Sequence, residues 1–197
     1  MTRFGRAQLV AFLRAIDRNL TADVEILVVG GAAVVVGYGA EAMTSDIDVL
    51  KMVGSKEAFG EAVHNARQET GLAVGVSGAT VFTSPDGFEE RVRSARGLHM
   101  ERLTFKVPEK YDLALSKIAA SGQRPHDLEA VERMHVKHHL SRMTLVERFE
   151  REMRNVSVLD SRQLSLTVAI AVARLYGYEE GKELARKYGV PVPRLKK

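Results

Sequence analysis

Cysteine is absent from this chain of 197 residues, and so is any apolar run long enough to cross a bilayer. Without cysteine, the chain can form neither a disulfide nor a thiolate metal site. Arginines interrupt the apolar helical pattern of residues 1–16, so we expect no signal peptide there. These absences are typical of a cytoplasmic protein, and this is the location that we predict.

Charge of one sign is not strongly in excess either. The sequence has 29 lysines and arginines against 25 aspartates and glutamates, a net charge of +4. This mildly basic balance permits binding to a polyanion such as a nucleic acid, but it does not require it. The sequence shows no internal repeat and no low-complexity segment. Its length allows one domain with a helical appendage or two small domains.

The most informative stretch of the sequence is residues 24–53, VEILVVGGAAVVVGYGAEAMTSDIDVLKMV. An apolar, β-branched run predicts a buried strand over residues 24–29. Two glycines break this strand, and the small residues that follow predict a short helix over 32–38. The run Asp-Ile-Asp-Val-Leu then predicts a second strand over 46–50.

Two aspartates and two glycines in this stretch are candidates for a functional site. Side chains alternate along a strand, so Asp46 and Asp48 are expected on one face, with the apolar residues between them in the core. Their carboxylates suit a hard cation, and the backbone N–H groups at Gly30 and Gly31 suit an anion at a helix start. Each signal alone is common in ordinary turns and solvated strand edges. In this order, the two together predict a site for a metal-bound polyphosphate.

The rest of the pattern predicts an α/β (α+β) fold. We expect a small mixed β-sheet core flanked by helices over residues 1–108, and a helical C-terminal region over 109–197 that packs on the core and completes the site. In the core the predicted helices are 4–20 and 56–70, the strands are 72–76, 79–83 and 103–107, a turn lies at 85–87, and the charged run 89–93 is a solvated face or a short helix. In the C-terminal region the predicted helices are 109–121, 125–139, 144–156, 161–176 and 179–188.

A second informative pattern lies in residues 111–131, YDLALSKIAASGQRPHDLEAV. Lys117 falls within one predicted helix, and Arg124 and Asp127 fall at the start of the next. Taken alone, these residues favour ordinary roles. The lysine would be solvated, the arginine would pair locally, and the aspartate would interact with the helix dipole in a first turn.

Together the two patterns resemble known proteins. The order Gly30-Gly31, short helix, Asp46-x-Asp48 resembles the nucleotidyltransferase superfamily of the DNA polymerase β type. The second pattern is similar to the Asp-Leu-x-x-x-Lys-hydrophobic-x-Ala and Arg-x-x-Asp-hydrophobic motifs of bacterial nucleotidyltransferases related to the abortive-infection toxin AbiEii. The residues that match these motifs are Asp112, Leu113, Lys117, Ala120, Arg124 and Asp127. The resemblance covers residues 24–135, with specific motifs only at its two ends.

The resemblance implies an enzyme that transfers a nucleoside monophosphate from an NTP onto an acceptor hydroxyl, with Mg²⁺ or Mn²⁺ as cofactor. It implies that Asp46 and Asp48 bind the metal and that these two aspartates and Lys117 are catalytic. The implied nucleotide-binding residues are Gly30, Gly31, Thr44, Ser45, Lys117, Arg124 and Asp127. The implied partners are the NTP, a tRNA or protein acceptor and a cognate toxin or antitoxin protein, with no membrane contact.

The chain departs from the pattern of these enzymes at two points. Many members have serine at the position of Gly31, and its hydroxyl can bond to a phosphate oxygen. Polymerase-type members also have a third carboxylate on a later strand. Glu101 is the nearest candidate for it, and Glu89 and Glu90 are others, but no motif surrounds any of them. The interpretation that the chain is a degenerate enzyme without catalytic activity therefore stays open.

Four other interpretations of the sequence are kept, two for the whole chain and two for single segments. The chain could be a non-catalytic protein that binds a nucleotide or a partner, such as an antitoxin, or an aminoglycoside-type nucleotidyltransferase with a small-molecule acceptor. His135, His138 and His139 have helical spacings that could bind a metal, although a basic solvated helix explains them better. The basic residues of 186–197 could contact RNA phosphates or form a solvated tail.

Overall fold

The computed structural model describes residues 2–79, 82–124, 126–155 and 160–193. It has the mixed α/β fold expected from the sequence. The chain divides into two compact units, and each is described here by itself. The sheet unit contains Met1–Phe82 and Glu89–Glu109, and the helical unit contains Thr83–Phe88 and Lys110–Lys197.

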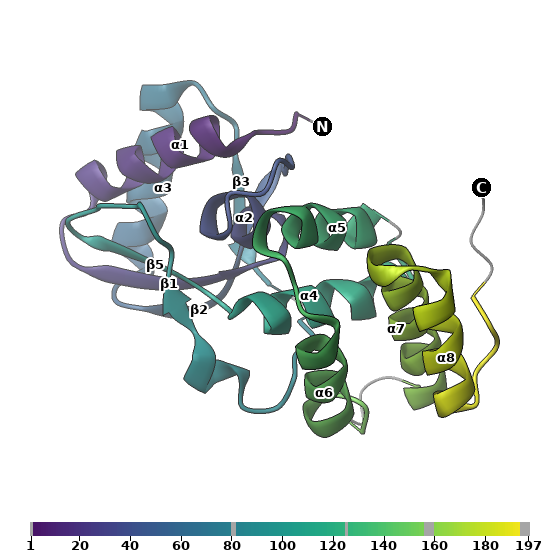
Figure 1. Cartoon of the computed structure of the whole chain (residues 1–197). Coiled ribbons are helices and arrows are strands. Elements are labelled where there is room, and N and C mark those ends of the chain that lie inside the picture. The colour runs from purple at the N-terminus through teal and green to yellow at the C-terminus, as the bar shows by residue number, and fades with distance from the viewer. Residues whose placement is uncertain (1, 80–81, 125, 156–159, 194–197) are drawn as a thin grey trace. The chain divides into compact units, whose positions relative to one another are not determined.

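A mixed five-stranded sheet in the order β3-β2-β1-β5-β4 forms the centre of the sheet unit, as far as the described residues show (Figure 1). Its strands are β1 (Val24–Val29), β2 (Asp46–Val53), β3 (Gly75–Gly78), β4 (Arg93–Ser94) and β5 (Leu103–Val107). Strand β1 pairs antiparallel with β2 and parallel with β5. At the sheet edges, β3 is parallel to β2 and β4 is antiparallel to β5. The predicted strands 24–29 and 103–107 are confirmed without change.

Two amphipathic helices, α1 (Arg6–Asn19) and α3 (Lys56–Thr70), lie beside each other in the sheet unit (Figure 1). Each buries its apolar stripe, as the periodicity predicted. The ends of α3 match the sequence signals. The Ser55 hydroxyl accepts a hydrogen bond from the Ala58 N–H at 3.1 Å. Gly71 closes the helix with φ of 67°, a left-handed conformation that glycine adopts without a steric penalty.

The helical segment after β1 differs in detail from its prediction. It begins directly at the glycines as the α-helical turn α2 (Gly30–Ala32), and it continues as the π-helical segment η1 (Ala33–Gly37). The wider turn brings Gly37 against β5, where an added Cβ would lie 2.7 Å from a methyl group of Val107. Close packing against the sheet explains why a run of small and β-branched residues winds as a helix here.

Two other predictions in this unit need correction. The strand predicted over 72–76 is displaced and forms β3 (Gly75–Gly78). In the strand predicted over 79–83, residues 79, 82 and 83 are not extended strand, and residues 80–81 lie outside the described residues. The short helix predicted as one alternative for the charged run 89–93 is confirmed as the 3₁₀-helix η2 (Phe88–Arg91), which leads into β4, a strand that was not predicted. A strand of two residues is too short to show an alternating pattern in the sequence, so β4 is defined only by its pairing with β5.

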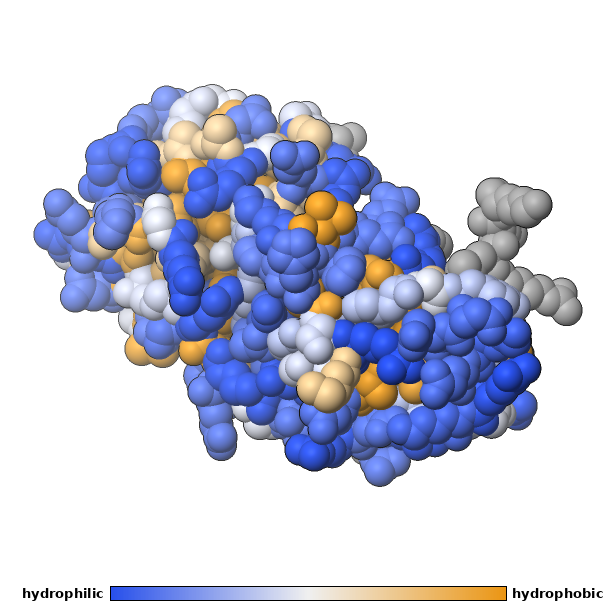
Figure 2. All heavy atoms as spheres, viewed as in Figure 1, coloured by the Kyte–Doolittle hydropathy of each residue, from blue (hydrophilic) through white to orange (hydrophobic). Residues whose placement is uncertain are grey.

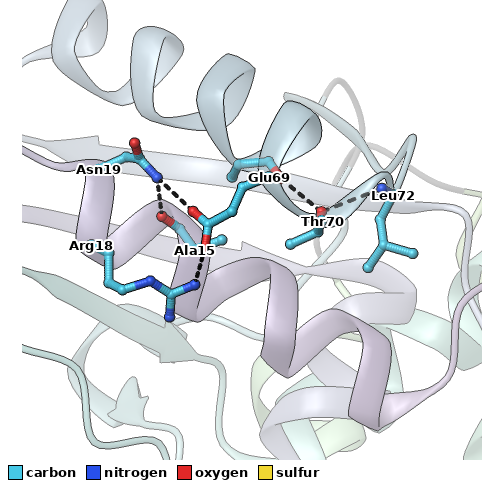
Figure 3. A network of polar contacts seen from close by, with 7 residues as sticks. Ala15, Arg18, Asn19, Glu69, Thr70 and Leu72 are labelled. Carbon is cyan, nitrogen blue, oxygen red and sulfur yellow. Dashed lines mark hydrogen bonds and ion pairs between the residues drawn. The ribbon is translucent and has the colours of Figure 1, made fainter.

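The C-terminal ends of α1 and α3 are joined by a surface network around Glu69 (Figure 3). The Glu69 carboxylate accepts hydrogen bonds from the guanidinium of Arg18 and, at 3.1 Å, from the amide of Asn19. The hydrogen bond from Arg18 is the main cause that lowers the pKa of Glu69. Because both charged side chains are well exposed, the ion pair orients the helix ends but adds little to stability.

Asp17, one turn before the end of α1, connects this helix to the start of β5. Its carboxylate accepts backbone hydrogen bonds from Glu101 at 3.0 Å and from Arg102 and Leu103 at 2.8 Å each. Partial burial acts to raise the pKa of Asp17, but the three backbone donors outweigh it and lower the pKa below 3.8. This aspartate therefore fixes the entry of the chain into β5.

The helical unit consists of helices close to those predicted. They are α4 (Lys110–Ser121), α5 (His126–His138), α6 (Arg142–Glu152), α7 (Ser161–Tyr176) and α8 (Tyr178–Tyr188). Helix α6 begins two residues earlier than predicted because Ser141 caps it, and it ends at Glu152, so residues 153–155 of the predicted helix form a turn instead. Helices α7 and α8 approach closely at Gly181, where an added Cβ would lie 2.3 Å from the Cβ of Ala173. Residues 125 and 156, at the ends of two predicted helices, lie outside the described residues.

Hydrophilic residues predominate on the face seen in Figure 2, and apolar residues form small separate areas there. The exposed large apolar side chains are Met43, Val53, Val136, Met143, Tyr178 and Val192. None of the helices in the described part of the chain has both the length and the apolar character needed to cross a membrane.

Candidate functional site

Strand β2 presents the two aspartates as the sequence predicted. Ile47 and Val49 are buried, with exposed fractions of 1% and 8%, whereas Asp46 and Asp48 are both partly exposed. The two carboxylates therefore share one face of the strand at its N-terminal end. Two negative charges on one face repel each other, and a cation between them would relieve this repulsion.

Gly30 lies against the carboxylate of Asp48. The antiparallel pairing of β1 and β2 places Val29 opposite Asp48, so the chain enters the glycine turn directly beside this side chain. A Cβ added at Gly30 would lie only 2.4 Å from Asp48 Oδ2, and the φ of Gly30 is +67°. Both observations require glycine here, one for space and the other for backbone conformation.

Gly31 lies against Thr44, the residue two positions before Asp46. A Cβ added at Gly31 would be 2.5 Å from Thr44 Oγ1 and 2.8 Å from Thr44 Cβ. The hydroxyl of Thr44 donates a hydrogen bond to Asp46 Oδ1 at 2.9 Å. The glycine turn, Thr44 and both aspartates thus form one cluster at this end of β1 and β2, which we call the Gly-Asp cluster (Gly30, Gly31, Thr44, Asp46 and Asp48).

Strand β3 adds features that sequence reasoning missed. It pairs with β2 in parallel so that Gly75 is opposite Asp46 and Ser77 is opposite Asp48. A Cβ at Gly75 would lie 3.3 Å from the Cβ of Asp46, so this glycine leaves room beside the first aspartate. Ser77 is exposed and shares the face of Asp48. The carbonyl of Ser45, a predicted nucleotide-binding residue, accepts the N–H of Gly75 at 3.1 Å and joins the two strands.

The register of β5 rules out Glu101 as the third carboxylate. Leu103 pairs with Val24 at the beginning of β1, whereas Asp48 pairs with Val29 at its end. Five residues of strand separate these positions, about 17 Å at a rise of about 3.3 Å per residue. Glu101 precedes β5 and therefore lies near the opposite end of the sheet from Asp48.

On the face of the aspartates, β5 offers a cation in place of a carboxylate. Lys106 pairs in register with Leu27, which lies two residues before Val29 and therefore on the same face. Its Nζ forms an ion pair with Glu25 Oε2 at 2.6 Å. Strand β5 thus has no acidic side chain between Leu103 and Val107 that could join Asp46 and Asp48.

Glu89 and Glu90 lie on η2 and are exposed. Within the part of the chain that the structure describes, no group of three or more histidine, aspartate or glutamate side chains is arranged to hold a metal ion. A metal at Asp46 and Asp48 would therefore need further ligands from a substrate or from water. By the same observation, His135, His138 and His139 in this described part form no metal site, and His139 lies beyond the end of α5 with a φ of +45°.

In the helical unit, the structure brings together three residues that the sequence singled out. Lys117 Nζ of α4 lies 2.5 Å from Asp127 Oδ1 of α5, and Arg124 Nε lies 3.0 Å from Asp127 Oδ2. The arginine contact is an ion pair, because its N–H is not directed well enough for a hydrogen bond. The side chains of Lys117 and Asp127 are 10% and 2% exposed, so the expectation of a solvated lysine from the residues alone was wrong.

Asp112, which also matches the second motif, is fully buried in the same unit. Its Oδ1 accepts a hydrogen bond from Arg148 Nη1 of α6 at 3.1 Å. The guanidinium of Arg148 also lies 5.6 Å from the centre of the Tyr111 ring. A buried carboxylate requires such a cationic partner, and Arg148 was not recognised from sequence because its partner is 36 residues away.

A comparison with protein families gives one match that covers most of the chain. Residues 7–181 match the model of a family described as nucleotidyltransferase of unknown function (DUF6036). The match includes the Gly-Asp cluster and the buried ion pair of α4 and α5. No curated protein and no solved structure matches the chain significantly.

Proposed function

The chain belongs to this family of nucleotidyltransferases, and from this premise we propose that it transfers a nucleoside monophosphate from a Mg²⁺-bound NTP to an acceptor hydroxyl. Asp46 and Asp48 would bind the metal, and the turn at Gly30 and Gly31 would bind phosphate. The observation that carries the proposal is the contact of Gly30 with Asp48: the turn that would bind the phosphates lies directly beside a carboxylate that would bind the metal.

The residues of the Gly-Asp cluster fit such a complex. Mg²⁺ prefers oxygen ligands and is commonly held by one or two carboxylates together with the phosphates of a substrate. Two carboxylates without a third acidic group suit this shared coordination. The N-cap position of the helical segment that starts at Gly30 is Val29, whose side chain makes no cap hydrogen bond. In the proposed complex the first N–H groups of this segment would bind the phosphates.

In the proposed reaction, the oxygen of an acceptor hydroxyl forms a bond to the α-phosphorus of the NTP. The bond from this phosphorus to the bridging oxygen breaks, pyrophosphate leaves, and the hydroxyl proton passes to water. Mg²⁺ would supply charge neutralisation at the phosphates. Asp46 and Asp48 would orient the NTP through it, and the N–H groups of Gly30 and Gly31 would stabilise charge on phosphate oxygens.

For Lys117, Arg124 and Asp127, a nucleotide-binding role stays a prediction from the resemblance. The ammonium of Lys117 has three N–H donors, and Asp127 accepts from one of them. A second donor could therefore contact a phosphate while the ion pair is kept. Within this proposal the acceptor is a hydroxyl of tRNA or of a protein, as in the toxin–antitoxin enzymes that the motifs resemble.

A second candidate function is nucleotide binding without transfer. The observation that favours it is Lys106 on β5, because polymerase-type enzymes have a carboxylate on a later strand. A site with two carboxylates can still hold Mg²⁺–NTP. Without a nearby base it would deprotonate the acceptor poorly. The two functions differ in one measurable property, the release of pyrophosphate.

The experiment incubates the purified full chain with Mg²⁺ and each α-³²P-labelled NTP, in the presence of total tRNA or a protein extract. We expect labelled RNA or protein from one or more NTPs, and loss of the label on Asp48→Asn. NTP binding without labelled product or pyrophosphate release would support the second candidate. Absence of Mg²⁺-dependent NTP binding would contradict both.

The matched control is Asp23→Asn, which removes the same charge from an exposed residue in the turn before β1. Asp48→Asn removes a metal ligand without creating a cavity, so it should fold as well as the control. If both variants lose activity equally, the loss reflects net charge and the Gly-Asp cluster is not the site. A third arm with aminoglycosides as acceptors tests the small-molecule alternative.

A further inference from the structure

Thr44 is a buried polar residue whose hydroxyl is directed at one of the two aspartates. It is 8% exposed, and its Oγ1 donates to Asp46 Oδ1 at 2.9 Å. The same oxygen lies 3.4 Å from the backbone carbonyl of Asp46. A threonine hydroxyl has a single proton, so the shorter contact, to the carboxylate, is the principal hydrogen bond.

The backbone of Thr44 is held as firmly as its side chain. It forms an isolated antiparallel bridge with Phe4, in which the Phe4 N–H donates to the Thr44 carbonyl at 2.7 Å. The Thr44 N–H donates back to the Phe4 carbonyl at 3.1 Å. Phe4 is itself buried, with an exposed fraction of 3%, and it lies two residues before the start of α1. The loop that leads into β2 is therefore anchored two residues before Asp46.

Thr44 also occupies space that a side chain at position 31 would need. A Cβ at Gly31 would lie 2.5 Å from Thr44 Oγ1 and 2.8 Å from Thr44 Cβ, both closer than such atoms approach in real structures. A side chain can fill this space from position 31 or from position 44, but not from both unless the backbone or the side chains shift. The hydroxyl oxygen of Thr44 thus lies only 2.5 Å from the position that the Cβ of a serine at position 31 would take.

We propose that Thr44 is a positioning residue for Asp46, rather than a nucleotide ligand. Its hydrogen bond holds the Asp46 carboxylate in one rotamer and leaves Oδ2 available to the metal. Gly31, which has no side chain, leaves the space that the Thr44 side chain occupies. The inference rests on the proposed function, because it assigns Asp46 as a metal ligand. Groups that orient a metal ligand commonly change metal affinity by about 10–100-fold when they are removed.

The first experiment compares Thr44→Val, which keeps the branched shape without the hydroxyl, with Thr44→Ser, which keeps the hydroxyl. Mn²⁺ serves as the probe, and its binding is measured by electron paramagnetic resonance with ATP present. We expect Thr44→Val to weaken Mn²⁺ binding by about 10-fold and Thr44→Ser to stay near wild type, with similar melting temperatures. If a product is formed, its metal dependence should shift in the same way.

If the wild-type protein binds Mn²⁺–ATP and Thr44→Val binds it equally well, only the proposed role of Thr44 is overturned. Absence of binding in wild type would overturn the proposed function, and this role with it.

The second experiment needs no metal. Gly31→Ser should lower the melting temperature in the wild-type background, and lower it much less in a Thr44→Gly background, where both the Oγ1 and the Cβ of residue 44 are gone. Equal effects of Gly31→Ser in both backgrounds would overturn the steric coupling between Thr44 and Gly31.

Discussion

Lys117 and Asp127 should stabilise the helical unit even in the absence of any nucleotide. Their side chains are 10% and 2% exposed, and their charged atoms lie 2.5 Å apart. Replacing Lys117 with methionine keeps the length of the side chain but leaves the Asp127 carboxylate buried without its closest cation. Removing one partner of a buried ion pair typically costs about 3–5 kcal/mol, because an uncompensated charge is left behind.

The structure places the expected loss near the lower end of this range. Arg124 stays 3.0 Å from the second oxygen of Asp127 and still compensates part of its charge, although its side chain is 57% exposed and water weakens this compensation. We therefore expect Lys117→Met to lower the free energy of unfolding by about 3 kcal/mol. Asp127→Leu should have a similar effect, because it leaves the buried ammonium of Lys117 without its partner. The double variant Lys117→Met/Asp127→Leu should lose less than either single variant, because neither charge is then left alone.

Urea unfolding followed by circular dichroism measures these differences. Lys182→Met is the matched control, since it removes a lysine whose partner Glu179 lies on the same helix surface and is 76% exposed. This control should lose less than about 1 kcal/mol. The reasoning is refuted if Lys117→Met is no more destabilising than the control, or if the effects of the two single substitutions simply add in the double variant.

Two further predictions concern stability. Gly181→Ala should lower the unfolding free energy by about 1–3 kcal/mol, because its Cβ would lie 2.3 Å from Ala173 Cβ and force α7 and α8 apart. The control Gly60→Ala in α3 has nothing within 4 Å of the new Cβ and should raise the unfolding free energy by about 0.5–1 kcal/mol. Equal effects of the two substitutions in thermal melts would refute the packing argument. Asp17→Asn should cost about 1–3 kcal/mol at neutral pH through weaker hydrogen bonds to the start of β5. Because the folded pKa of Asp17 lies below 3.8, wild type loses this advantage as the pH falls from 3.8 through that lower value. A gap between wild type and variant that stays constant from pH 7 to pH 2, relative to the same change at Asp23, would contradict the assignment.

Several elements could be predicted from sequence because their signals are local. β1 is a short run rich in β-branched residues, and α3 is flanked directly by a serine cap and a terminal glycine. The alternation that puts Asp46 and Asp48 on one face also depends only on the period of an extended strand. The glycine turn and these aspartates could therefore be assigned to one candidate site before the structure was known.

The tertiary structure decided what depends on contacts between distant segments. β4 exists because it pairs with β5, and the register of β5 excludes Glu101 and places Lys106 on the face of the aspartates. The hydrogen bond from Thr44 to Asp46 depends on a loop conformation that Phe4 anchors from 40 residues away. Periodicity in a sequence describes which way a residue points within its own element, whereas register and partner choice are set by the packing of elements far apart in the chain.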